Sequence, residues 1–337
     1  MTSRAGRALR LGSGLGALAG LALLATLIAY RDVATLGRML LAADWGIAAV
    51  TAFYLLPMAA TAHAWRAATR PVWRGRALVF FWARLVREAV NSLLPVAQIG
   101  GNVVGARILT FHGARAGVAG ASAIVDLTVE FLTQIIFTAF GVGLFLHRGA
   151  GSAAAPIVLG LAVVVGAAGG FLLAQRRGMF KLVGRRMERI AARFGWTALG
   201  SLANLHEAMV AIYRDRRAIA TTAAWHLVAW LLGVVEMWLI LVFLDAKVGF
   251  ATAFVIESLG QAIRSAGFLV PGALGIQEGG YMLLGTFFGL GPDTALAISL
   301  IKRIRDVALG APAMLAWQFV EGRRLLDTFD GAKTDGP

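Results

Sequence analysis

Several ionisable side chains of this sequence stand inside apolar stretches, where a charge is expensive unless it is paired or used. Asp126 and Glu130 lie one helical turn apart, and Glu278 follows a stretch rich in proline and glycine. Two carboxylates this close in apolar surroundings do not both ionise readily, and such a pair can bind and release a proton. We therefore predict that Asp126, Glu130 and Glu278 are candidates for proton coupling.

Arginine is the second residue type that could do chemistry in these stretches. Its guanidinium group binds a phosphate through two parallel hydrogen bonds. Amide and carboxylate side chains at helical spacing from the arginines would complete a polar site on one face of each helix. The residues predicted to bind a lipid headgroup are Arg84, Arg87, Glu88, Asn91, Gln98, Arg264, Gln277 and Arg303.

The same charges also allow a purely structural interpretation, because buried charges must be paired whether or not they bind a ligand. Asp126 or Glu130 could pair with an arginine of another segment. Lys302 and Asp306 stand four residues apart, which places them on one helix face. We predict that Lys302 and Asp306 form a structural ion pair, and both interpretations stay open for the other charges.

Catalytic and metal-binding motifs are missing from the chain. It contains no GxxxxGK[ST], HExxH or GxSxG sequence and no cysteine, and its five histidines lack the spacing of metal ligands. His63 and His226 are interpreted as packing residues. We therefore expect no metal, no cofactor and no enzymatic activity.

The composition indicates that lipid, rather than water, is the main solvent of this chain. Of its residues, 58% are apolar and only 15% are charged, whereas about a quarter of the residues of a soluble domain are charged. A helix that crosses the hydrocarbon needs about 20 mostly apolar residues. Such runs stand at residues 11–30, 45–64, 114–146, 154–175, 218–244 and 294–320. We therefore predict an all-α integral membrane protein with six full transmembrane helices.

The net charge of +14 would suggest nucleic acid as the partner of a soluble protein, but here the arginines cluster between the apolar runs. Basic residues are frequent in the N-terminal tail and in segments 65–76 and 176–217, and rare near Arg148 and Lys247. This alternation predicts that both termini are cytoplasmic and that no nucleic acid is bound. Segment 176–217 has the pattern of an amphipathic connector on the inner leaflet.

Two further stretches, residues 77–110 and 250–291, are apolar but interrupted by proline and glycine. Broken backbone at membrane depth is tolerated only where protein or a water-filled cavity satisfies its polar groups. The stretches also match each other: EAVNS with QAIRS, LLP with LVP and QIGG with QEGG. Three predicted crossings separate them, so two re-entrant hairpins would enter from opposite faces, as in the inverted repeats of secondary transporters. Chance similarity between apolar segments is the alternative.

Longer motifs extend this pattern: WARLVREAVNSLLPVAQIGGNVVGARIL, DLTVEFLTQ, LVPGALGIQEGGYMLLGTFFGL and LIKRIRDVALGAPAMLAWQ. With them the chain resembles the lysylphosphatidylglycerol synthase transmembrane (flippase-like, MprF-type) family, and within it the hopanoid-associated members. The resemblance implies a bacterial inner-membrane protein whose relatives translocate aminoacylated phospholipids between leaflets. Those relatives add a soluble aminoacyl-transferase domain, which this chain lacks, so lipid synthesis is not expected.

These observations favour one function over two alternatives. The favoured function is an inner-membrane lipid translocator for a hopanoid or for an anionic or aminoacyl phospholipid. The alternatives are a non-transporting scaffold or accessory protein of hopanoid or phospholipid biosynthesis, and an intramembrane enzyme that modifies a lipid. Membrane lipids and proteins of lipid biosynthesis are the expected partners. We expect one flippase-like domain over residues 1–325, followed by a short polar tail at 326–337.

Overall fold

The computed structural model of the protein describes residues 33–94, 100–147, 200–267, 270 and 273–334. This part of the chain is helical and contains no strand, which confirms the predicted all-α class. Its helices are α2 (Val33–Ala42), α3 (Trp45–Phe53), α4 (Leu55–Thr69), α5 (Ala77–Leu93), α6 (Gly100–Phe111), α7 (Ala116–His147), α10 (Gly200–Arg214), α11 (Arg216–Phe243), α12 (Phe250–Ala266), α13 (Ile276–Phe287) and α14 (Pro292–Thr334).

Three stretches of helix are long and apolar enough to cross a membrane. They are Trp45–Thr69, which joins α3 and α4, Ala116–His147 and Arg216–Phe243. Each coincides with one of the runs predicted from the sequence. The predicted span 294–320 lies within α14, where Lys302, Arg303, Arg305 and Asp306 make the helix more polar. The predicted runs 11–30 and 154–175 lie outside the described residues.

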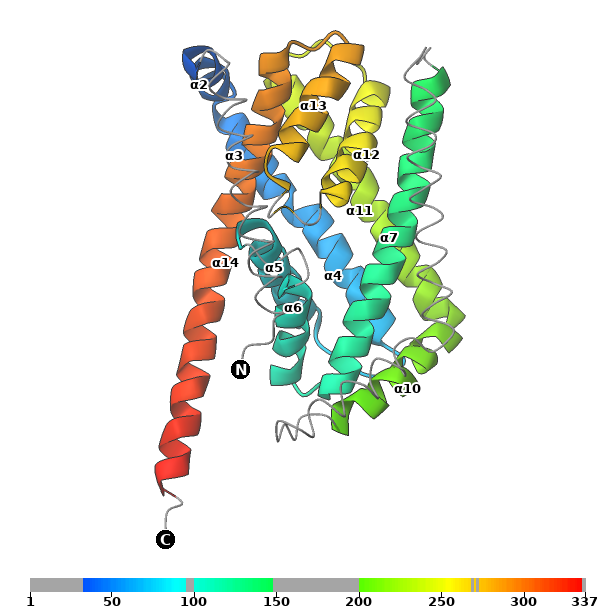
Figure 1. Ribbon diagram of the computed structural model, residues 1–337, viewed down its shortest axis with the longest axis vertical. Coiled ribbons are helices and arrows are strands. Elements are labelled where there is room, and N and C mark those ends of the chain that lie inside the picture. Colours follow the sequence, from blue (N-terminus) through cyan, green and yellow to red (C-terminus); the bar gives the residue numbers. More distant parts are fainter. Residues whose placement is uncertain (1–32, 95–99, 148–199, 268–269, 271–272, 335–337) are drawn as a thin grey trace, which may run out of the picture.

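The two stretches broken by proline and glycine form two pairs of adjacent helices. In each pair, α5 with α6 and α12 with α13, the arms pack against each other. The pairs lie toward opposite ends of the long axis (Figure 1).

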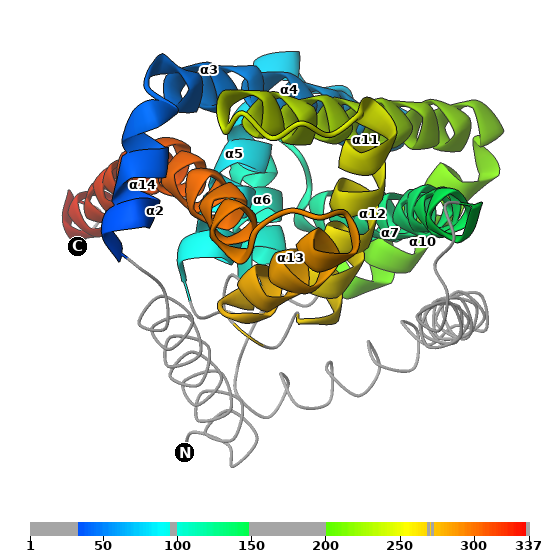
Figure 2. The same ribbon diagram turned by 90° about the horizontal axis from the view of Figure 1, so that it is seen from above.

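The packing between helices repeats in the two parts of the chain. Helix α4 packs on α5 as α11 packs on α12, and α6 packs on α7 as α13 packs on α14. Across the molecule, α5 contacts α14 while α12 contacts α7, and α4 lies beside α11 (Figure 2). We call α3 to α7 the first half and α11 to α14 the second half. Two copies of one helical motif would pack in this way.

The apolar core fixes each helix pair to its neighbours. In the first half, Trp65 of α4 packs edge-on against Phe80 of α5, with ring centroids 5.9 Å apart. In the second half, Met237 and Ile240 of α11 pack in one buried cluster with Ile298 of α14. Each pair is therefore held by the long helices on either side of it.

The connector predicted at 176–217 is described only from residue 200, where α10 begins. Helix α10 packs against α7, with Met209 and Ile212 buried in an apolar cluster that includes Val125. At least part of the apolar face of α10 therefore packs on protein.

The repeated Gly-Gly motif lies where the arms of each pair come close together. A Cβ on Gly101 would lie 2.2 Å from the carbonyl oxygen of Arg87, and one on Gly280 would lie 2.8 Å from the side chain of Ile263. A Cβ on Gly279 would meet nothing within 4 Å. The second glycine of each motif therefore permits the close contact.

We expect Gly101→Ala to lower the free energy of unfolding by about 1–3 kcal/mol, because its methyl group would push against backbone that cannot turn away. Gly279→Ala is the matched control and should be neutral or slightly stabilising, since alanine favours the helix and the space is open. Thermal unfolding in detergent micelles compares the two variants. Similar losses of stability in both would contradict this account of the motif.

Candidate functional site

The first polar cluster joins α5 to α7 inside the first half. Arg84 and Arg87 are three residues apart on α5, and Asp126 and Glu130 are four apart on α7, so each pair shares one helix face. Arg87 Nη1 lies 3.0 Å from Asp126 Oδ2, and Arg87 Nη2 lies 2.8 Å from Glu130 Oε2. Arg84 also donates to both oxygens of Glu130. Two guanidinium groups thus balance two carboxylates.

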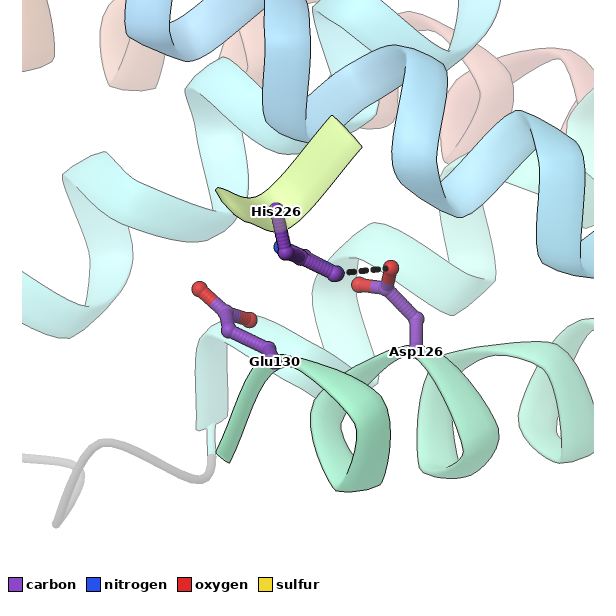
Figure 3. Close-up of side chains that lie close together, drawn as sticks. All are labelled: Asp126, Glu130 and His226. Atoms are coloured by element: carbon purple, nitrogen blue, oxygen red, sulfur yellow. Dashed lines mark hydrogen bonds and ion pairs between the residues drawn. The ribbon is translucent and has the colours of Figure 1, made fainter. Parts of the chain in front are cut away.

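His226 reaches this cluster from α11 in the second half. Its Nε2 lies 3.0 Å from Asp126 Oδ1, and both side chains are buried (Figure 3). The atoms of Asp126, Glu130 and His226 that could bind a metal ion lie within 4.8 Å of one another. Arg84 and Arg87 already bind both carboxylates and would repel a cation, so we assign no metal site here.

A second cluster corrects the ion pair predicted within α14. Lys302 donates to Glu257 of α12, with 2.5 Å between Nζ and Oε2, and both side chains are buried. Asp306 instead accepts two hydrogen bonds from Arg305, at 3.0 and 2.6 Å. The predicted Lys302–Asp306 pair is therefore wrong. The ammonium group of Lys302 pairs with a carboxylate of another helix, and residue spacing within α14 could not reveal this partner.

Arg305 is a site residue that the sequence analysis missed. Its guanidinium group binds Glu236 of α11 as well as Asp306, and its central carbon lies 3.6 Å from the centroid of the Tyr54 ring. A lone carboxylate in an apolar span, such as Glu236, must have a partner. That requirement was the signal that could have led to Arg305.

Glu278 lies at the start of α13, where the helix dipole favours a negative charge. Its Oε1 accepts from Arg303 Nε and from Ser299 Oγ, each at 3.0 Å. Gln277 donates to the same serine at 3.1 Å. The second carboxylate oxygen of Glu278 is buried without a hydrogen-bond partner.

The contact between the two helix pairs is looser than any of these clusters. Arg264 Nη2 of α12 lies 3.5 Å from Glu88 Oε1 of α5, and the two side chains are 16% and 23% exposed. Glu88 also lines a small cavity together with Tyr54, Ser92 and Asp306. Arg264 and Glu88 are therefore predicted headgroup residues that are partly exposed and joined to each other by one long contact.

The other predicted headgroup residues have structural partners or lie outside the described residues. Arg84, Arg87 and Arg303 are held in the ion pairs above. The side-chain oxygen of Asn91 accepts from the backbone nitrogen of Gly101 at 2.9 Å and so holds the start of α6. Gln98 falls in the segment 95–99, which is outside the described residues.

Comparison with known proteins shows to which family the chain belongs. Residues 14–312 match the family described as the lysylphosphatidylglycerol synthase TM region. The chain belongs to this family. No curated protein and no solved structure matches it. Together with the apolar helices, the match makes it a multi-pass membrane protein with a lipid-related role.

In this lysylphosphatidylglycerol synthase TM family member, the buried arginine and lysine ion pairs of the described residues follow the division into halves, whereas the buried His226–Asp126 contact joins the halves. The first half pairs Arg84 and Arg87 with its own carboxylates. The carboxylates of the second half are paired with Lys302, Arg303 and Arg305.

Charged contacts between the halves are of a different kind. One is the long Arg264–Glu88 contact, and another is the peripheral pair Arg107–Glu321, whose arginine is 52% exposed. His226 and the Tyr54 ring supply the remaining contacts described above. Each half therefore neutralises most of its own buried charge.

Proposed function

We propose that this protein moves lipid headgroups between the two leaflets of a bacterial inner membrane. The observation that carries the proposal is the division of ion pairs between the halves. A rocking motion of one half against the other would break the long Arg264–Glu88 contact and the His226–Asp126 contact, but would leave the arginine–carboxylate and lysine–carboxylate pairs of each half intact. Alternating access in transporters built from repeats is a motion of this kind.

The proposal treats the α5–α6 and α12–α13 pairs as two re-entrant hairpins in an inverted repeat among six full spans. Their position toward opposite ends of the molecule supports this arrangement (Figure 1). Their broken connections would then meet at membrane depth, where protein surrounds them and lipid does not.

The orientation follows from the distribution of basic residues. Arg66, Arg70 and Arg74 lie where α4 leads into α5, whereas Lys247 lies where α11 leads into α12. By the positive-inside rule, we place the α4–α5 connection and both termini in the cytoplasm.

The headgroup would bind where Arg264 meets Glu88. A phosphate can form two charge-assisted hydrogen bonds with Arg264, whereas Glu88 forms one long contact. An anionic headgroup could therefore displace Glu88 as the halves move. We propose an anionic or aminoacyl phospholipid, or a hopanoid with a polar headgroup, as the substrate, and Asp126, Glu130 and Glu278 as candidates for proton coupling.

The test is translocation of a fluorescent phosphatidylglycerol in proteoliposomes. We expect Arg264→Gln to slow translocation about 10- to 100-fold, which is what the loss of charged hydrogen bonds worth about 1.5–3 kcal/mol would produce. Arg107→Gln removes the same charge from a peripheral pair and should transport at the unmutated rate. No lipid movement by the unmutated protein, or full activity of Arg264→Gln, would contradict the proposal.

A scaffold or accessory protein of lipid biosynthesis is the second candidate function. It is favoured by the central cavity, whose volume of about 10 Å³ offers room for about one water molecule and no headgroup. A scaffold would bind a lipid-synthesising enzyme and leave the rate of lipid movement equal to that of empty liposomes.

A further inference from the structure

A second and larger hollow lies at the end of α4, away from the contact between Arg264 and Glu88. Its volume is about 280 Å³, and it is lined by Arg66, Arg70, Arg74 and Gly75. The three arginines are exposed to solvent. The hollow therefore brings three positive side chains together in a space that a small ligand could enter.

The local fold holds these arginines in place. Arg66 and Arg70 are four residues apart and so share one face of the last turns of α4. The chain then turns, and Arg66 Nε donates to the carbonyl oxygen of Gly75 at 3.2 Å. The ring of Trp73 packs against Phe80, with centroids 5.8 Å apart. The turn that presents Arg74 is thus fixed to the core.

The turn also explains the glycine in the lining. A Cβ on Gly75 would lie 2.4 Å from the Trp73 ring. Any larger residue would displace that ring from Phe80, so the floor of the hollow depends on a residue without a side chain.

No carboxylate of the described residues forms an ion pair with Arg66, Arg70 or Arg74. Three like charges that converge without a counter-charge from the described part of the chain repel one another, and a bound anion would remove this repulsion. Guanidinium groups from several directions match the oxygens of a phosphate. The lining therefore fits a phosphate better than a neutral or cationic ligand.

The position of the hollow indicates where the phosphate comes from. It directly follows the apolar helix Trp45–Thr69, so it lies where a span of that length leaves the hydrocarbon. Lipid phosphates occupy this depth, and arginines just outside a span attract anionic lipids. We propose that Arg66, Arg70 and Arg74 form a binding site for the phosphate of an anionic lipid. This site is separate from the translocation path and does not depend on it.

The test measures binding of short-chain phosphatidylglycerol to the purified protein in a zwitterionic detergent. The double variant Arg70→Gln with Arg74→Gln should bind this lipid about 10- to 30-fold more weakly, because it removes two of the three guanidinium groups that would bind the phosphate. The matched control is Arg216→Gln with Arg217→Gln. It removes two exposed arginines from the start of α11 without touching the hollow, and it should change affinity less than about threefold.

A second titration uses glycerol phosphate, which lacks the acyl chains. Weak binding of this soluble phosphate, with strong binding of the lipid, is the expected result. Equal binding of both, still lost in the Arg70/Arg74 variant, would overturn the lipid as the source of the phosphate. Equal weakening in the two double variants, or none in the Arg70/Arg74 variant while its melting temperature is unchanged, would overturn the site.

Discussion

Replacing Lys302 by methionine is expected to lower the free energy of unfolding by about 3–5 kcal/mol. Both Lys302 and Glu257 are buried, and the carboxylate has no other charged partner within ion-pair distance in the described structure. Methionine fills a similar volume, so the loss comes from an orphaned carboxylate rather than from an empty space. Unfolding in mixed micelles, followed through helix content, measures it.

The double variant Lys302→Met with Glu257→Gln should recover most of this loss. A glutamine at 257 is neutral and can still accept the hydrogen bond that Gln261 donates at 2.8 Å. The interaction energy between the two changes should therefore reach about 2 kcal/mol or more. Glu321→Gln, which breaks the peripheral pair with Arg107, is the control and should cost about 1 kcal/mol or less. Simple additivity of the two buried changes would contradict a specific Lys302–Glu257 pair.

Asp126→Ala is expected to be as severe, with a loss of about 3–5 kcal/mol. Asp126 accepts from Arg87 and from His226 and lies 3.6 Å from Arg84. Its removal leaves two buried guanidinium groups with Glu130 as their only carboxylate. The same unfolding measurement applies, with Glu207→Gln on the exposed face of α10 as a control that should change stability by less than about 0.5 kcal/mol.

Charge balance predicts that a second substitution restores part of the stability lost in Asp126→Ala. Adding Arg87→Met to Asp126→Ala restores one guanidinium group to one carboxylate and should regain part of the stability. If the second change instead adds its own full loss, Arg87 is held by packing and the electrostatic account of the cluster is wrong.

The general architecture could be predicted from the sequence because it depends on local patterns. Apolar length indicated the spans at 45–64, 114–146 and 218–244, and each is a helix in the structure. The broken stretches are pairs of helices because several prolines and glycines close together favour the end of one helix and the start of another. The charged residues of α14 were placed on a helix because they lie within the apolar run 294–320.

Partners could not be predicted, because helical spacing tells which residues share a face and not what that face meets. Asp126 and Glu130 were predicted to lie one turn apart on one helix, but the partners of the polar side chains of α7 come from different helices. Ser122 accepts from Trp65 of α4, while Gln134 donates to Ser265 of α12. Lys302 and Arg305 are three residues apart but bind carboxylates of α12 and α11. Such choices depend on tertiary packing, which a single sequence does not display.

The confinement of the buried arginine and lysine ion pairs to each half has a consequence for biosynthesis. A membrane protein is inserted as it is synthesised, from its N-terminus onward, and a lone charge at the bilayer centre opposes insertion. Arg84 and Arg87 precede Asp126 and Glu130 in the chain, so the first cluster can close before any residue of the second half leaves the ribosome. Glu236 and Glu257 would then be unpaired only until α14, which carries their partners, is inserted. The chain can thus be inserted as two successive units whose buried ion pairs are each complete, and the contacts between them can form last.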